Sequence, residues 1–396
     1  MVLRLLLPAV LLLVACPIWA GDYENVLSGI ENNSITLAAA RRSVESSRAD
    51  LHTQNTLEGP EAGFDYLWGN KNVPDNRINF NLSQSIDFPV LYHRRRSLIN
   101  SEERNVDLRY SVLRREVLSQ ARSKCISVIY CNRMLKFFNR HLDHTQALAT
   151  AYHNLMEQGQ ATVLESGKAA LAVAKVSTEK RRIEIERASL MSSLQAMNGG
   201  NAVELNDTLY PEFVLPADAD KYCELALENS PELALALGEA NSAHRKSSVE
   251  SAEALPKLSV GYTGEKQGSD LLQGVSVGVA IPLWSNRSKV RAARAAAASA
   301  QLQATDIRTE AEYRLRAVYN TAVTNKRIVA DFERAIADTG YGYWLAKALE
   351  LRNISVTDYI QELGVLCTAI ESLEEAKRDA AGADAEAASY LEPFSF

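Results

Sequence analysis

The chain has 396 residues and a formal net charge of −6, with 46% hydrophobic and 23% charged residues. This composition excludes a disordered chain, and the acidic balance argues against nucleic-acid binding, which requires a basic surface. The length allows two or three ordinary domains. Proline is absent from residues 90–210 and 283–392, which are runs of 121 and 110 residues. Such runs exclude an all-β or finely alternating α/β fold and predict very long helices.

The first 20 residues are predicted to be a signal peptide. A short basic segment, residues 1–4, precedes an apolar segment, residues 5–14, and small residues follow. An apolar segment of about ten residues is too short for a bilayer, which needs about 20. Residues 13–16 also fit a bacterial lipobox, in which case Cys16 becomes a lipidated first residue. Both alternatives predict an exported chain.

The chain aligns with itself as two copies of one unit. Segments 83–90 and 160–163 fall on segments 276–283 and 353–356 at an offset of 193 residues. Upstream, Asn33 meets Asn229 at an offset of 196. A single change of offset is expected when two copies of a duplicated unit differ in the length of one loop.

The repeat predicts the organisation of the whole chain. The parts are a signal peptide (1–20), a first repeat (21–200), a linker (201–217), a second repeat (218–390) and a C-terminal tail (391–396). Predicted helices cover 22–57, 90–157 and 162–198 in the first repeat and 218–255, 284–352 and 355–389 in the second. A helix of about 68 residues is about 100 Å long, so these helices are predicted to pack along each other as coiled coil.

A β-hairpin is predicted after the first helix of each repeat, at 61–88 and 257–283. Apolar residues alternate there with polar or small ones, for example Ile78, Phe80 and Leu82, and again Val275, Val277 and Val279. A period of two residues with one apolar face is typical of strands in a membrane barrel. Aromatic residues at the hairpin ends are predicted to form an aromatic belt at the lipid interface; they are Trp68, Tyr92, Tyr262 and Trp284.

Four strands are too few to close a barrel, because the interior has no room and the edges stay unpaired in lipid. The chain is therefore predicted to oligomerise. A trimer gives twelve strands, an even number as bacterial outer-membrane barrels require. The predicted fold is mainly α with a membrane β-barrel, in which twelve long helices continue the tube as a trimeric α-helical barrel.

The paired hairpins, the apolar-Pro steps at Pro89 and Pro282, and the small-residue turn before each last helix resemble the TolC family of outer-membrane efflux proteins. The resemblance covers residues 22–389. It implies a homotrimeric channel-tunnel that crosses the outer membrane of a Gram-negative bacterium, contacts outer-membrane lipids and extends into the periplasm. It also implies two partners, a periplasmic adaptor protein and an inner-membrane pump of the RND or ABC type.

The resemblance also implies a pore constriction near two periplasmic turns, one containing Gly159 and Gln160 and the other Arg352 and Asn353. Family members often have glycine where Arg352 stands. The inward-facing aspartate of the family matches Asp358, and the equivalent residue of the first repeat is Glu165. Their partners three residues further on are Gln361 and Lys168. The alternative interpretation of all four side chains is that they are ordinary solvated helix residues.

The sequence predicts neither an enzyme nor a cofactor. The chain lacks a CxxC pair, a nucleophile elbow and a glycine-rich phosphate loop. His141 and His144 lie three residues apart, as zinc ligands can, but no third ligand stands at a fitting spacing, so no metal site is predicted. The four cysteines after Cys16 are predicted to be buried thiols. Two further function classes stay open, a periplasmic adaptor and a structural coiled-coil protein of the envelope.

Overall fold

The computed structural model describes residues 21–69, 76–281, 286–351 and 353–394. The predicted signal peptide with Cys16, as well as Arg352, Pro282 and Trp284, lie outside these ranges. The chain forms two compact units. The first unit comprises the described residues up to Ile35, Leu118–Phe213 and Thr324–Ala385, and the second comprises Thr36–Val117, Val214–Val323 and the described residues from Glu386. Each unit contains parts of both predicted repeats, whose boundaries remain predictions.

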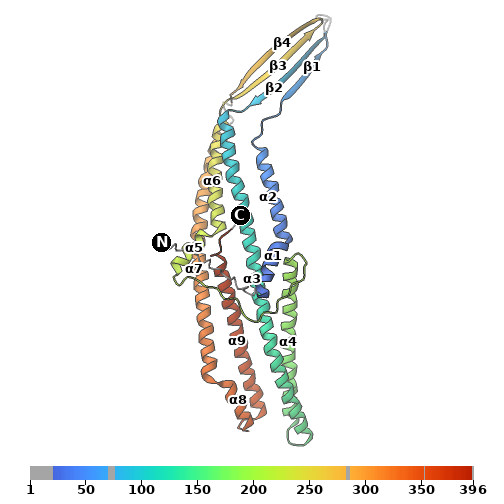
Figure 1. Ribbon diagram of the computed structural model, residues 1–396, viewed down its shortest axis with the longest axis vertical. Helices are drawn as coiled ribbons and strands as arrows, with labels where there is room; N and C mark the ends of the chain where they lie inside the picture. Colours follow the sequence, from blue (N-terminus) through green and yellow to red (C-terminus); the bar gives the residue numbers. More distant parts are fainter. Residues whose placement is uncertain (1–20, 70–75, 282–285, 352, 395–396) are drawn as a thin grey trace, which may run out of the picture. The chain divides into compact units, whose positions relative to one another are not determined.

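The described chain is mostly helical and has one four-stranded sheet (Figure 1). In chain order the elements are α1 (Asp22–Asn33), α2 (Ile35–Thr53), β1 (Glu61–Leu67), β2 (Arg77–Ile86), α3 (Pro89–Glu157), α4 (Val163–Met197), α5 (Ala219–Glu228), α6 (Pro231–Ala252), β3 (Lys257–Gln267), β4 (Asp270–Ala280), α7 (Asn286–Thr339), α8 (Tyr341–Glu350) and α9 (Val356–Ser389). Among the described residues, no helix combines the length and the apolar character needed to cross a membrane.

Three helices that the sequence predicts as continuous are each interrupted, so those predictions are wrong. The predicted helix 22–57 breaks at Ser34, and 218–255 breaks at Ser230, whose hydroxyl caps α6 by accepting from the Leu233 N–H. The predicted helix 284–352 breaks at Gly340, where the backbone is left-handed with φ 52°. Glycine adopts that conformation without steric cost. The long helix α3 and the last helices α4 and α9 are confirmed to within one residue of their predicted ends.

In each predicted repeat, a hydrogen bond joins one of the shorter helices to the end of the last helix, at equivalent positions. In the first, Asn33 Nδ2 donates to Asn198 Oδ1 at 3.0 Å, just after α4 ends. In the second, Asn229 Nδ2 donates to the Leu391 carbonyl at 3.3 Å, just after α9 ends. The pairs are related by the offsets of 196 and 193 residues found in the sequence. The two predicted repeats therefore correspond at these helix ends as well as at the hairpins.

The strands run antiparallel in the order β1-β2-β3-β4 (Figure 1). Their register brings like residues to the same face. Phe64 lies opposite Phe80, and Val260 lies opposite Val277. Directly paired residues in an antiparallel ladder share a face, so the predicted apolar rows combine into one apolar face. The opposite face carries small and polar residues from all four strands, including Gly63, Asn79, Asn81, Ser83, Ser259, Gly261, Thr263, Ser276 and Gly278.

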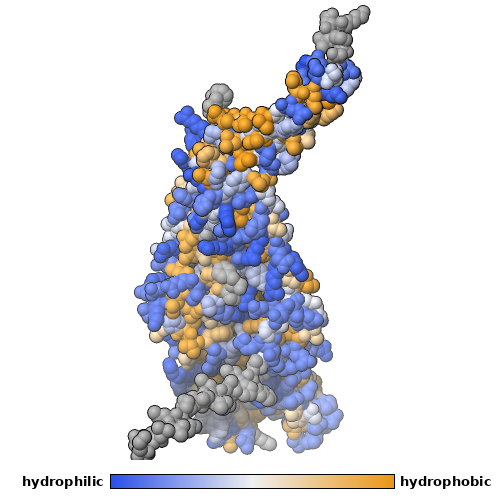
Figure 2. Space-filling model, turned by 45° about the horizontal axis from the view of Figure 1, so that its top comes forward, coloured by the Kyte–Doolittle hydropathy of each residue, from blue (hydrophilic) through white to orange (hydrophobic). Residues whose placement is uncertain are grey.

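The apolar face is exposed in the single chain. Val275, Val277 and Phe64 are 82%, 74% and 67% exposed. Figure 2 shows hydrophobic residues gathered over part of the sheet. The base of the sheet is fixed by Asp87, which is 5% exposed and lies 2.8 Å from Arg95 and 3.2 Å from Lys257. The hairpins are thus joined to the start of α3 by a buried carboxylate that contacts two cations.

One hydrophobic core cluster of the first unit lies between α3 and α4. Its buried residues are Tyr130, Cys131, Met134, Phe138 and Val176. The four cysteines that the structure describes are buried and unbridged, as predicted. Burial raises the pKa of Cys131 to about 12, with smaller contributions from neighbouring charges, so the thiol stays protonated and acts as a small apolar side chain.

The segment after α4 is attached to the same core by side chains of α3 and α4. Asn132 Nδ2 donates to the carbonyls of Leu205 and Asp207 at 3.1 and 3.0 Å. Arg133 Nη1 donates to the Thr208 carbonyl at 2.9 Å, and Arg187 Nε donates to Asn132 Oδ1. The first part of the predicted linker is therefore a fixed part of the first unit.

Substitution of Gly199 tests how tightly the chain packs against the Asn33 backbone. Gly199→Ala is expected to destabilise the protein by more than Gly200→Ala, since both glycines are left-handed but only a Gly199 Cβ would meet the Asn33 carbonyl oxygen, at 2.5 Å. The conformation alone costs about 1–2 kcal/mol. The measurement is the midpoint of urea unfolding of both variants. Equal midpoints would show that the Asn33 backbone moves away without cost.

Candidate functional site

The turn between α3 and α4 contains the first predicted constriction residues. Gly159 has φ 71°, which reverses the chain, and the N–H of Gln160 returns to the Leu155 carbonyl at 2.8 Å. Helix α4 then begins with a capping box: Glu165 N–H donates to Thr162 Oγ1 at 3.2 Å, and Thr162 N–H donates to Glu165 Oε2 at 2.8 Å. The hydrogen bond from the Thr162 backbone lowers the pKa of Glu165 below its usual value.

The turn before α9 repeats this arrangement. The N–H of Asn353 donates to the Ala348 carbonyl at 2.9 Å. Asp358 N–H donates to Ser355 Oγ at 3.1 Å, and that hydroxyl donates to Asp358 Oδ2 at 2.7 Å. Asp358 and Glu165 thus occupy equivalent positions in the first turn of their helices, where a carboxylate is stabilised by the helix dipole. Asp358 is exposed and Glu165 is partly exposed in the single chain.

The structure therefore gives both carboxylates a capping role that the sequence interpretation missed, although Thr162-x-x-Glu165 is a recognisable capping-box signature. Lys168 and Gln361, predicted as partners of these carboxylates, instead line a common recess. A place for Asp358 and Glu165 at a pore constriction remains a prediction.

Substitution of Asp358 separates its capping role from its predicted role at the pore constriction. Asp358→Asn keeps a hydrogen-bond acceptor for Ser355 but removes the charge, whereas Asp358→Ala removes both and is expected to cost about 1 kcal/mol of helix capping. If Asp358 lines the constriction, both variants weaken cation selectivity in planar bilayers, because carboxylate rings select cations. Unchanged conductance and selectivity in both variants would contradict the constriction and leave only the cap.

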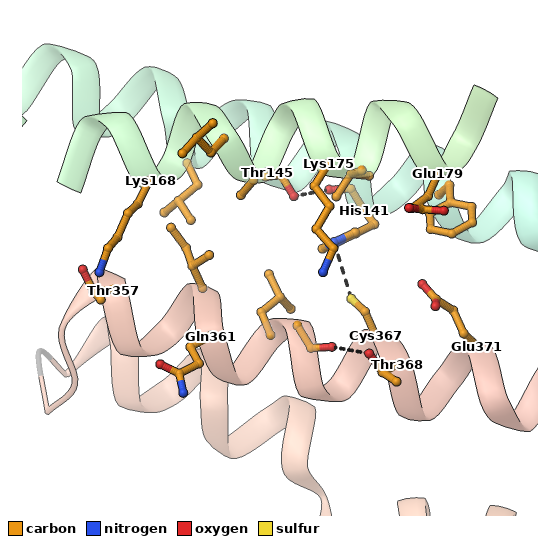
Figure 3. Close-up of a pocket in the computed structure, with 18 residues that line it drawn as sticks. His141, Thr145, Lys168, Lys175, Glu179, Thr357, Gln361, Cys367, Thr368 and Glu371 are labelled. Carbon is orange, nitrogen blue, oxygen red and sulfur yellow. Dashed lines mark hydrogen bonds between the residues drawn. The ribbon is translucent and has the colours of Figure 1, made fainter. Parts of the chain in front are cut away.

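The recess lies between α3, α4 and α9 in the first unit and has a volume of about 590 Å³ (Figure 3). Leu148, Leu171, Ile360 and Leu363 contribute apolar surface. Lys168 and Lys175 extend from α4 toward α9, and Glu179 and Glu371 lie at one end (Figure 3). Burial, with the nearby Glu179 charge, raises the pKa of Glu371. No sequence spacing reveals this recess, because its three helices meet only in the folded chain.

The two histidines considered as zinc ligands have other partners. His141 Nε2 lies 3.4 Å from Cys367 Sγ, and His144 Nε2 lies 2.8 Å from the Tyr359 hydroxyl. Burial lowers the pKa of His141, and the neighbouring His144 adds to this effect, so the neutral ring is favoured. Within the described ranges, no group of three or more histidine, cysteine or acidic residues is placed to hold a metal ion.

The structure describes three of the four residues of the predicted aromatic belt, Trp68, Tyr92 and Tyr262. Trp68 is 82% exposed just after β1, and Tyr92, in the first turn of α3, accepts a hydrogen bond from the Asp87 N–H. Tyr262 lies in the middle of β3, so its predicted place at a hairpin end is wrong. The strand continues to Gln267 because its ladders with β2 and β4 extend beyond Tyr262 as far as the turn at Gly268.

No protein-family model and no curated protein matches the chain. Solved structures match it over most of its length. CusC, whose report describes transmembrane channel formation, is 13% identical with a TM-score of 0.80, over 94% of this chain and 92% of that chain. The outer-membrane protein VceC of Vibrio cholerae is 13% identical with a TM-score of 0.75, over 94% and 97%. The outer-membrane channel CmeC of Campylobacter jejuni is 12% identical with a TM-score of 0.71, over 93% and 85%.

The chain has the fold of these outer-membrane channels. The predicted resemblance to the TolC family is confirmed for the fold, as is the predicted combination of long helices with a small antiparallel sheet. In this channel fold, the sheet and the capped turns are features of different units, the sheet of the second and the turns of the first. Closure of the sheet into a twelve-stranded barrel remains a prediction.

Proposed function

We propose that the protein is an outer-membrane channel that passively conducts substrates exported by an inner-membrane pump. The observation that carries the proposal is the sheet, whose one face is apolar and exposed while the other is polar or small. An apolar face of this kind is unfavourable in water and suits lipid, whereas the opposite face suits a water-filled pore. Successive side chains along each strand would therefore face lipid and water in turn.

The sheet edges support assembly from several copies. In the described chain, β1 and β4 each have a neighbouring strand on one side only. Unpaired backbone groups are very costly in hydrocarbon, where no water can satisfy them. Pairing β4 of one copy with β1 of the next removes both edges. A homotrimer then has twelve strands, a number compatible with outer-membrane barrels.

The remaining parts of the proposal rest on the resemblance. Solved proteins with this fold are described as outer-membrane channels, which supports a place in the outer membrane of a Gram-negative bacterium. The first unit extends into the periplasm and meets a periplasmic adaptor, which connects it to an inner-membrane pump of the RND or ABC type. Conduction itself requires no bond making and no cofactor. The periplasmic adaptor alternative is not favoured.

Fractionation and conductance test the proposal together. The full chain, expressed in a Gram-negative host, is expected in the outer-membrane fraction as an oligomer whose gel mobility changes on heating. Reconstituted in planar bilayers, it is expected to give discrete single-channel conductance. Recovery as a soluble periplasmic monomer would reject the channel and favour an adaptor or an envelope coiled-coil protein. Crosslinking in cells followed by purification identifies the adaptor and the pump.

A further inference from the structure

The two helices that follow the hairpins, α3 and α7, begin with basic residues and without acidic ones. Residues 89–101 of α3 contain three arginines and no Asp or Glu, and residues 286–305 of α7 contain four basic residues and no Asp or Glu. The first turns of α1, α4, α5, α6 and α9 each contain an acidic residue instead. Because the helix dipole disfavours cations near the start of a helix, an anionic partner would stabilise this arrangement.

Two of these cations already have partners within the fold. Arg94 Nη1 donates to the Ser248 carbonyl at 2.6 Å, and Arg95 lies between the carboxylates of Asp87 and Glu253. The other five are exposed and together form a basic patch, which consists of Arg96, Arg287, Lys289, Arg291 and Arg294. Within the described ranges, none of the five forms an ion pair. The basic patch therefore carries five charges that the described chain does not neutralise by direct pairing.

The basic patch lies beside the base of the sheet in the second unit, where the starts of α3 and α7 meet the end of α6 (Figure 1). Arg95 of α3 contacts the Glu253 carboxylate at 3.1 Å, and Asn286 Nδ2 of α7 donates to the Glu253 carbonyl at 2.5 Å. Arg95 and Lys257, the first residue of β3, both contact Asp87. These contacts hold the start of both basic helices next to the strands.

Exposed apolar residues continue from the sheet to the edge of the basic patch. Phe88, Val90 and Ile281 are 42%, 41% and 60% exposed. Arg96 stands six residues after Val90, about 9 Å along α3, and Arg287 stands six residues after Ile281. The headgroup layer on each side of a bilayer is about 5–8 Å thick. Long basic side chains this close to an apolar surface extend to the level of the lipid headgroups.

We propose that the basic patch binds the phosphate groups of anionic phospholipids in the membrane leaflet that faces the periplasm. The apolar face of the sheet would contact the acyl chains, and the cations of α3 and α7 would contact the headgroups of the same lipids. Basic clusters beside a membrane-embedded segment attract anionic lipids in this way. The proposal rests on the proposed function, because it requires the apolar face of the sheet to lie in lipid.

Removal of three of the five cations tests the proposal. The full chain is purified as an oligomer in a neutral detergent, and its heat-dissociation temperature is measured with added phosphatidylglycerol, which is anionic, or phosphatidylcholine, which has no net charge. Wild type is expected to be stabilised more by phosphatidylglycerol. The combined variant Arg287→Gln, Arg291→Gln and Arg294→Gln is expected to lower the apparent affinity for phosphatidylglycerol about tenfold or more.

The matched control makes the same change of charge further along the same helix. It combines Arg308→Gln, Arg314→Gln and Arg316→Gln, all at exposed positions of α7. This control is expected to keep the wild-type affinity for phosphatidylglycerol. No loss of affinity in the first variant, or an equal loss in the control, would overturn the proposal.

Two measurements on wild type do not depend on any variant. The effect of phosphatidylglycerol is expected to shrink between about 50 mM and about 500 mM salt, because salt screens exposed charges. An effect that salt leaves unchanged would overturn the proposal. Inorganic phosphate is expected not to stabilise the oligomer, and stabilisation equal to that by the lipid would show that the ligand is free phosphate and overturn the proposal.

The same preparation distinguishes this inference from the channel function. A wild-type oligomer that conducts but shows no preference for phosphatidylglycerol would refute the lipid site and leave the channel function intact. Absence of oligomer and conductance in wild type would instead refute the function.

Discussion

Replacing Arg133 by methionine is expected to lower the free energy of unfolding of the first unit by about 3–5 kcal/mol, the cost of leaving a buried charge without its partner. Arg133 Nη2 donates to Glu374 Oε1 at 2.8 Å, and the Glu374 side chain is only 12% exposed. The guanidinium also lies over the Tyr210 ring, at 5.4 Å from its centroid. One side chain thus connects α3, α9 and the segment after α4.

This effect is expected to depend on pH. Burial alone would raise the pKa of Glu374, but the hydrogen bond and charge of Arg133, with Lys377, lower it below the usual value of 4.5. A carboxylate whose pKa is lower in the folded state than in the unfolded state stabilises the fold at pH values above its unfolded-state pKa. This stabilisation is lost as the pH falls through the folded-state pKa. The difference between wild type and Arg133→Met is therefore expected to be largest at neutral pH and to shrink below about pH 4.5.

Urea unfolding of the detergent-solubilised protein, across this pH range, measures the effect. The control is Arg334→Met, which removes an exposed pair with Asp331 and is expected to cost at most about 1 kcal/mol. Adding Glu374→Gln to Arg133→Met is expected to restore part of the stability, since it removes a carboxylate that has lost its arginine partner and keeps only Lys377, at 3.6 Å. A double variant as unstable as the single one would show that Arg133 acts through packing.

Arginine at Val275 is expected to prevent assembly, whereas arginine at the adjacent Ser276 is not. Val275 lies on the apolar face of β4 opposite Tyr262, and Ser276 lies on the polar face opposite Gly261. An arginine on the lipid face of an outer-membrane barrel costs about 2–4 kcal/mol near the middle of the bilayer. Each protomer of a trimer pays this cost, so the folded fraction falls steeply.

The measurement is the fraction of each variant that reaches the outer membrane with heat-modifiable mobility. Ser276→Arg should assemble and change single-channel conductance, because its side chain enters the pore. Equal assembly of the two variants would show that the apolar face does not meet lipid, and a preference for Val275→Arg would reverse the assignment of the faces.

The sheet could be predicted because alternation is a local property. Ile78, Phe80 and Leu82 point the same way whatever strand pairs with them, and the register then places Leu82 opposite Tyr262. The proline-free runs likewise predicted α3 without knowledge of its neighbours. The break at Gly340 was missed because a single glycine inside a helical pattern has no distinctive sequence signal, and only its left-handed backbone ends α7.

The candidate site was less accessible to sequence reasoning. Asp358 and Glu165 were interpreted through a resemblance, while their hydrogen bonds with Ser355 and Thr162 follow from helix ends that could be recognised locally. The recess with Lys175 and Glu371 could not be predicted, because residues 196 positions apart meet only after α4 and α9 pack on α3. Ser230 followed by Pro231 did signal a helix start, and the predicted continuous helix passed over it.

The two capped turns share a backbone design but differ in charge: the first carries Glu165 followed by Lys168, and the second Asp358 followed by Gln361. In a trimer the backbone would therefore approach sixfold symmetry at the helix turns, while the electrostatic pattern repeats only three times. In the proposed trimer, charge at the turns would distinguish three of the six turns from the other three, although the six backbones are alike.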